Sequence, residues 1–335
     1  MKNINDVAEL VGVSIATVSR ALSKPEVVHP ETLKKIEAAV AQLNYHPNRL
    51  AIGLRRQRSS NIIIAVPSIF NPFTSAFVQG VENVAREAGY RVLLGITESD
   101  QTLLDSYVDM IGGRQADGLI LLDCILPKVV KTPPQGAAPP PIVVACEYPP
   151  GLDIPRVRLD NVESAALVVR HLTKLGHLNI ATIIGPPLQQ MAKDRLAGFQ
   201  LGLRRAGLEL HEDLVVHGDF SVESGYQATK ELLRRATTFT AVCCANDEMA
   251  IGALAALREA GRQVPAEVSV VGFDNLRFGE FASPPLTTVD IPALDIGEAA
   301  MYLMLDRLRD PIDSMREVLL PYRLITRDSS GPAPV

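Results

Sequence analysis

The sequence predicts an N-terminal all-α helix-turn-helix headpiece followed by an α/β core of two doubly wound parallel-sheet subdomains. Residues 3–46 show short helical patterns and almost no strand signal, whereas short apolar runs alternate with amphipathic helical stretches from Asn61 onward. The charged residues are also distributed unevenly between these two parts of the chain. Residues 1–60 carry nine Lys and Arg against five Asp and Glu, and the remaining residues carry 24 against 33. A small basic unit on a large acidic body suggests a polyanion-binding module.

Composition and length limit the classes of protein to which this chain can belong. A chain of 335 residues with 47% hydrophobic and 21% charged residues suggests two or three globular domains. No run of about 18 apolar residues is present, which excludes a membrane-spanning helix. The N-terminus lacks a signal peptide's apolar run, so we expect a cytoplasmic protein. Cys124, Cys146, Cys243 and Cys244 lack CxxC spacing and are expected to be thiols, with no metal or cofactor.

The first 47 residues form the predicted headpiece. A helix over residues 5–11 has its apolar side chains on one face and is broken at Gly12. Ser14 is expected to cap a second helix over 15–22, and Pro30 opens a third that ends near Asn44. A basic segment of low apolar content, residues 48–60, then joins the headpiece to the core.

The core, residues 61–335, shows the strand–helix alternation of parallel sheets. The predicted strands are 62–66, 91–96, 118–123, 142–146, 179–184, 241–245 and 268–273. The predicted helices are 74–88, 101–113, 162–175, 193–206, 222–235, 246–260 and 292–308. We expect a first subdomain over about 61–160 and 291–320, and a second over about 161–290 and 321–335, with the C-terminal segment crossing between them.

The pattern DVAxxxGVSxxTVSR at residues 6–20 is the most specific signal in the chain. Ala8, Val13 and Val18 would pack the two helices together, with Gly12 in the turn. An α-helix fits the DNA major groove, and hydroxyls at its N-terminus can bond phosphates. The candidate DNA contacts are Ser14, Ile15, Ala16, Thr17, Ser19 and Arg20. The alternative is a surface helical hairpin in which Arg20 is merely solvated.

The joint at residues 48–56 has two open interpretations. It could form a helix only on DNA, with Leu54 wedged into a minor-groove base step and Arg55 and Arg56 on phosphates. It could equally be a disordered linker. On the first interpretation Ala51, Leu54 and Arg55 are candidate DNA contacts.

These motifs resemble those of the LacI/GalR family of bacterial transcription regulators over essentially the whole chain. The resemblance lies in the headpiece and hinge, and then in GDFSVESGY at 218–226, ANDEMAIGAL at 245–254, PAEVSVVGFDN at 265–275 and PPLTTVDIP at 284–292. Within the family the chain is most similar to the cytidine-repressor type, through NPF at 71–73 and GFDN…PPLTT at 272–288. One departure is Gly53 inside the presumed hinge helix, which costs about 1 kcal/mol of helix stability relative to alanine.

The resemblance implies a core like that of periplasmic sugar-binding proteins, with three crossovers and an effector in the cleft between the subdomains. Carried over by motif, the effector-binding residues are Phe70, Phe73, Asp160, Arg195, Phe220, Asn246 and Asp274. The aromatic side chains could stack on a ring, while Asp274 and Arg195 hold hydroxyl groups, so we expect a nucleoside or a sugar. Taken singly, Arg195 could instead form a surface ion pair, Asp274 a turn, and Phe73 part of the core.

The resulting hypothesis is a DNA-binding regulator, a repressor controlled by a small-molecule effector. It would act as a homodimer on double-stranded, pseudo-palindromic operator DNA, with no membrane partner and no catalytic residues. The alternatives are a solute-binding protein, disfavoured by the helix-turn-helix, and an α/β enzyme, for which GxSxG, HExxH, Walker A and GxGxxG motifs are missing. The C-terminal residues carry no leucine heptads, which favours a dimer over a coiled-coil tetramer.

Overall fold

The computed structural model describes residues 3–45, 58–132, 139–147, 154–310 and 316–334. The chain divides into two compact units, Met1–Ser59 and Ser60–Val335. The predicted hinge contacts Ala51, Leu54 and Arg55, together with Gly53, lie outside the described residues. Among the helices that are described, none is long and apolar enough to cross a membrane.

The N-terminal unit is a helix-turn-helix, as predicted. It comprises α1 (Ile4–Val11), α2 (Ile15–Ser23), a short 3-10 turn η1 (Pro25–Val27) and α3 (Pro30–Gln42). Gly12 ends α1 at φ 72°, a left-handed conformation that suits glycine, and Ser14 caps α2 by accepting a hydrogen bond from the Thr17 amide. Ala8 and Val18 are buried and Val13 packs against them, which confirms the predicted contact between the first two helices.

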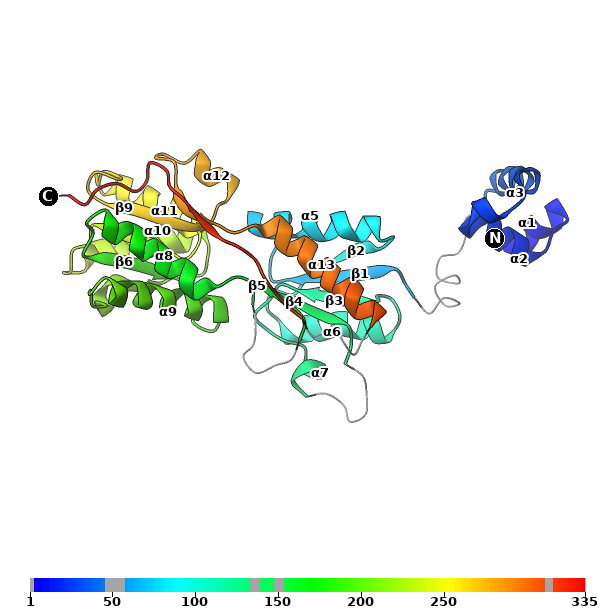
Figure 1. The fold of residues 1–335 in the computed structure, drawn as a ribbon, viewed down its shortest axis with the longest axis horizontal. Helices are drawn as coiled ribbons and strands as arrows, with labels where there is room; N and C mark the ends of the chain where they lie inside the picture. Colours follow the sequence, from blue (N-terminus) through cyan, green and yellow to red (C-terminus); the bar gives the residue numbers. More distant parts are fainter. Residues whose placement is uncertain (1–2, 46–57, 133–138, 148–153, 311–315, 335) are drawn as a thin grey trace. The chain divides into compact units, whose positions relative to one another are not determined.

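The first core sheet, sheet A, has six parallel strands in the order β11-β5-β4-β3-β1-β2. Their bounds are β1 Asn61–Val66, β2 Arg91–Ile96, β3 Gly118–Leu121, β4 Ile142–Ala145, β5 Arg156–Arg158 and β11 Glu317–Leu319. The helices of this subdomain are α5 (Pro72–Glu87), α6 (Gln101–Gly112), α7 (Lys128–Lys131) and α13 (Ala293–Arg309). One apolar cluster joins α5 and α13 to the sheet and another joins α6 to it, so helices cover both faces (Figure 1).

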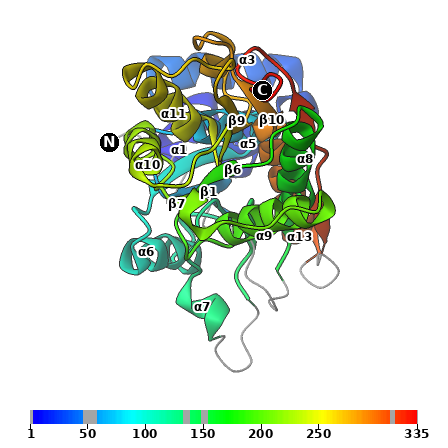
Figure 2. The ribbon, with the colours of Figure 1, turned by 90° about the vertical axis from the view of Figure 1, so that its left-hand side faces the viewer.

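The second core sheet, sheet B, has the order β12-β10-β9-β8-β6-β7 and is parallel except for β12, which pairs antiparallel with β10. Its strands are β6 Ile180–Ile184, β7 Val215–His217, β8 Ala241–Cys244, β9 Ser269–Asp274, β10 Thr287–Asp290 and β12 Arg323–Ile325. Its helices are α8 (Asn161–Lys174), α9 (Gln190–Arg205), the 3-10 turn η2 (Glu212–Leu214), α10 (Val222–Arg234), α11 (Asp247–Glu259) and α12 (Arg277–Glu280). The pairs α8/α9 and α10/α11 lie on opposite faces (Figure 2).

The α10/α11 pair packs closely through two glycines. A Cβ added at Gly252 would collide with the Val222 carbonyl oxygen, and one added at Gly225 would collide with the Met249 backbone. The N-terminal turns of the two helices are therefore held side by side. Those turns carry Glu223 and Glu248.

Within the described residues the chain passes between the two sheets three times. Residues 159–160 lead from β5 to α8, residues 291–292 from β10 to α13, and residues 320–322 from β11 to β12. Each connection is two or three residues long, and the second and third contain Pro292 and Pro321.

The seven predicted core strands and seven predicted core helices all occur, and their ends differ from the predicted ones by at most three residues. The largest shift is in α9, which begins at Gln190 rather than at 193. Five of the observed strands were not predicted as separate strands, namely β5, β7, β10, β11 and β12. With three or four residues each, they are too short for a periodic pattern to mark them.

Candidate functional site

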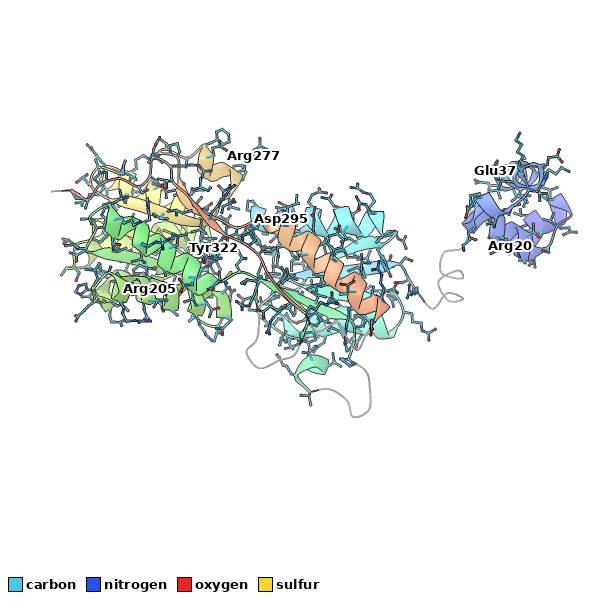
Figure 3. All side chains as sticks on the ribbon, in the orientation of Figure 1. Arg20, Glu37, Arg205, Arg277, Asp295 and Tyr322 are labelled. Atoms are coloured by element: carbon cyan, nitrogen blue, oxygen red, sulfur yellow. The ribbon has the colours of Figure 1, made fainter. Side chains whose placement is uncertain are left out.

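The outward face of α2 carries the predicted DNA contacts. Ser14, Ile15, Ala16 and Arg20 are exposed, while Thr17 and Ser19 are half-buried. Arg20, labelled in Figure 3, projects from the last turns of the helix. The Ser14 and Thr17 hydroxyls are hydrogen-bonded to each other at 2.9 Å, so two hydroxyls lie together at the helix N-terminus. Such a face offers a cation, two hydroxyls and small apolar side chains to a groove.

The core contains a cavity of about 630 Å³ at the carboxyl ends of the sheet strands. This volume is within the range of small-molecule sites. Leu159, Asn161 and Ile291, which lie at two of the crossovers, form part of its wall. Open α/β sheets bind ligands at this edge, because strand ends and helix N-termini converge there.

The cavity brings together six of the seven predicted effector-binding residues. They are Phe70, Phe73, Arg195, Phe220, Asn246 and Asp274. Asp160 is the exception, since it is not among the lining residues. Its carboxylate instead caps α8 by accepting a hydrogen bond from the Glu163 amide at 2.9 Å, and the neighbouring Asn161 lines the cavity.

Arg195 lies on α9 and is 5% exposed, so its guanidinium is held mainly by the protein. Its Nε donates to Asn161 Oδ1 at 3.1 Å, and its Nη1 donates to the Ala245 carbonyl. The guanidinium lies 3.9 Å from the centroid of the Phe273 ring. Its Nη2 is 3.6 Å from Asp274 Oδ1, which is an ion pair too long for a strong hydrogen bond. Arg195 is therefore fixed in place before a ligand arrives.

Asp274 ends β9 in a strained and poorly solvated position. Its φ is 107°, and its side chain is 9% exposed. Burial raises its pKa to about 7, although the Arg195 charge opposes that shift. Asp247, at the start of α11, accepts hydrogen bonds from the Leu276 amide and the Thr288 hydroxyl, each at 2.6 Å. Burial likewise raises the pKa of Asp247, to about 8.

The aromatic side chains differ in how firmly they are held. Phe220 has φ 71° and its ring lies over Gly185, where an added Cβ would collide with it. Asn246 supports Phe220, because its side-chain amide donates to the Phe220 carbonyl at 2.9 Å while its Oδ1 caps α11. Phe70, by contrast, is 91% exposed. Positive φ values at a site wall are a form of strain that the surrounding structure must maintain.

Five carboxylates line the cavity in addition to Asp274, and none was predicted. They are Asp123, Glu147, Asp219, Glu223 and Glu248. Asp123 is the last residue of the predicted strand 118–123, and Glu147 directly follows the predicted strand 142–146. The strand-end rule that selected Asp274 could therefore have found both residues. Burial raises the pKa of Glu147, and burial together with the nearby Glu223 raises that of Glu248.

Two family descriptions match the chain. "Bacterial regulatory proteins, lacI family" matches residues 3–48, and "Periplasmic binding protein-like domain" matches residues 169–330. Among curated relatives, the HTH-type transcriptional repressor CytR of Escherichia coli (strain K12) is 36% identical over 331 residues, covering 99% of this chain and 97% of the relative. The ribose operon repressor of the same strain is 32% identical, covering 98% of this chain and 100% of the relative.

Solved structures agree with these relatives. The lac repressor dimer bound to operator and the anti-inducer ONPF has a TM-score of 0.89 and 30% identity, covering 98% of this chain and 99% of that one. The complex of the transcriptional regulator CelR with cellobiose has a TM-score of 0.75 and 31% identity, covering 98% of this chain and 100% of that one. The chain thus belongs to the LacI family, and it is a DNA-binding transcriptional repressor with an effector-binding core rather than an enzyme.

Proposed function

We propose that a nucleoside or a sugar binds in the core cavity and changes the affinity of the protein for its operator. The observation that carries this proposal is the joint occurrence of a helix-turn-helix and a 630 Å³ cavity in one chain. Aromatic and hydrogen-bonding side chains share the cavity wall, which is the chemistry expected for a polar ligand with a flat face.

Within this proposal the cavity residues have different roles. Phe73 and Phe220 flank the flat face of the ligand, and Phe70 closes over it from the mouth. Asp274 accepts hydrogen bonds from ligand hydroxyls. The guanidinium N–H groups of Arg195 that do not donate to protein acceptors donate to ligand oxygens. Asn246 acts indirectly by holding Phe220. Asp160 caps α8 next to the cavity-lining Asn161, and its contact with the ligand stays a prediction.

On DNA, α2 would lie in the major groove with Arg20 at a base edge. Ile15 and Ala16 would contact thymine methyl groups or set the fit, and the Ser14 and Thr17 hydroxyls would bind phosphate. Ala51, Leu54 and Arg55, which lie outside the described residues, would add further DNA contacts, with Leu54 as the minor-groove wedge and Arg55 on a phosphate. A repressor of this kind acts on chromosomal operators, which is consistent with the expected cytoplasmic location.

A homodimer would present two such headpieces to a pseudo-palindromic operator. Exposed apolar side chains support this part of the proposal. Leu94 and Ile96 on the edge strand β2 are 47% and 37% exposed, and Phe278 in α12 and Phe281 at its C-terminal end are 63% and 74% exposed. Apolar surface of this kind is costly in water and is typical of interfaces.

Operator binding and ligand binding can be measured on one preparation. A duplex selected from a random pool by the protein itself should be retained at moderate salt, with affinity followed by fluorescence anisotropy. A ligand at 100 times its Kd should stabilise the protein by about 2.7 kcal/mol, a readable thermal shift. It should also change operator affinity, because the proposal requires different ligand affinities in the DNA-bound and free states. A bound ligand that leaves operator affinity unchanged would contradict the regulatory role.

A further inference from the structure

The cavity carries far more negative than positive charge. Among its lining residues that the structure describes, six are carboxylates and one, Arg195, is a cation. Arg195 forms an ion pair with Asp274 at 3.6 Å and its charge also acts on Glu147, so one cation faces six carboxylates. Hydroxyl groups of a neutral ligand could donate hydrogen bonds to these carboxylates, but they would leave the net negative charge of the cavity uncompensated after water is displaced.

Some of this charge is balanced by the protein, and some is not. Asp123 accepts hydrogen bonds from the Thr97 and Ser99 hydroxyls, and Asp219 accepts one from the Ser221 amide. For Glu223 and Glu248 the first turns of α10 and α11 supply only the partial positive charge of helix N-termini. Since Gly225 and Gly252 hold these two turns together, the two carboxylates face the same small space.

Glu147 independently indicates that a hydrogen-bond donor of a ligand binds in the cavity. It follows β4, lines the cavity and is 9% exposed. Its Oε2 accepts a hydrogen bond from the Gln190 amide at 3.0 Å, but its buried Oε1 has no hydrogen-bond partner. A carboxylate oxygen that is removed from water and left unpaired is costly, and a donor on the ligand would satisfy it.

We infer that the effector carries a positively charged amine, so that within the proposed nucleoside or sugar class it is an amino sugar or an amino-substituted nucleoside. The ammonium group lies beside Glu223 and Glu248, a second donor of the same ligand faces the unpaired oxygen of Glu147, and the ring lies against Phe73 and Phe220. An ammonium provides three donors and no acceptor, which matches acceptor-only carboxylates, and it is also attracted by aromatic faces. This inference rests on the proposed effector site and specifies its ligand.

The test compares cations with neutral partners of matched shape, using the full chain and titration calorimetry. The pairs are D-glucosamine and D-glucose, 3′-amino-3′-deoxyadenosine and adenosine, and choline and 3,3-dimethylbutan-1-ol. The cation of at least one pair should bind at least about tenfold more tightly than its partner, as expected for a new ion pair in a partly buried site. Glu248→Gln should reduce that preference several-fold. Glu212→Gln, at an exposed position in η2, should leave it unchanged.

Two outcomes would overturn the inference. One is neutral members that bind as tightly as their cations. The other is the failure of every cation at about 10 mM, because a lining with six carboxylates and one cation should retain even a poorly fitting ammonium at that concentration. Operator anisotropy on the same samples separates this result from the regulatory proposal. If a neutral ligand alters operator affinity, the regulatory proposal stands and the amine proposal is wrong. If a cation binds tightly without an effect on operator affinity, the amine proposal stands and the regulatory proposal is wrong.

Discussion

Replacing Asp274 by asparagine changes the charge of the cavity while nearly preserving its shape. Asparagine tolerates positive φ better than most residues, so the 107° conformation can be kept. The wild-type carboxyl has a pKa raised to about 7 because burial disfavours its ionised form more than Arg195, 3.6 Å away, favours it. The asparagine variant has no charge to bury at any pH.

The size of the effect follows from proton linkage. The unfolded chain releases the Asp274 proton near pH 4, whereas the folded protein keeps it until about pH 7. A raised pKa therefore contributes stability below pH 4 that is lost as the pH rises through 7. About three pKa units correspond to about 4 kcal/mol. The stability of Asp274→Asn minus that of wild type should rise by about this amount between pH 4 and pH 8.

Urea unfolding followed by circular dichroism suits this measurement, because the chain contains no tryptophan. Taking the difference between variant and wild type at each pH cancels the titration of other groups. A difference that does not change with pH would refute the reasoning. So would a variant that is less stable by 3–5 kcal/mol at pH 8, the result expected if the buried ion pair with Arg195 dominated. A folded variant that has lost ligand binding would then assign Asp274 to the effector site.

Four further predictions concern other parts of the molecule. Arg20→Ala should lose about 1–3 kcal/mol of discrimination between operator and random duplexes, and an unchanged ratio in competition binding would contradict base readout. Gly252→Ala should cost about 1–3 kcal/mol of core stability by chemical unfolding, because its Cβ meets the neighbouring helix backbone. Burial lowers the pKa of His177, whose Nε2 is 3.0 Å from the Gly331 carbonyl, so the protection factors of the C-terminal amides, which correct for the intrinsic pH dependence of hydrogen exchange, should decrease as pH falls below about 6.5. Phe281→Asp should shift a dimer toward monomer in sedimentation, whereas an unchanged mass would place the interface elsewhere.

Sequence patterns predicted the fold well where elements are long. The strand Asn61–Val66 stands out because it is a continuous apolar run, and the helix Gln101–Gly112 stands out because its apolar spacing repeats over several turns. β5 and β7, with three residues each, give no such repetition and are stabilised by their neighbours in the sheet. The antiparallel pairing of β12 with β10 could not be predicted from local sequence either, because it depends on the path of the chain after β11.

The candidate site was predictable in position but not in charge. Strand ends locate Asp274 and would locate Glu147, yet the sequence does not say which carboxylates have partners. Asp123 is satisfied by hydroxyls from a loop more than 20 residues earlier, while Glu147 keeps an unpaired oxygen. Asp160 is assigned to ligand binding by its motif, and that assignment stays a prediction. The structure shows that its carboxylate also caps α8, a local use that a motif match does not reveal.

The three short connections between the sheets restrict how the two subdomains can move relative to each other. Because each connection has two or three residues, and two of them contain proline, sliding or separation of the subdomains is disfavoured, and a hinge rotation about the connections remains. Leu159 and Ile291 belong to two of these connections and also line the cavity, so a ligand in the cavity would contact the hinge itself. The size of the bound molecule would then set the angle between the subdomains directly, without a change of packing inside either subdomain.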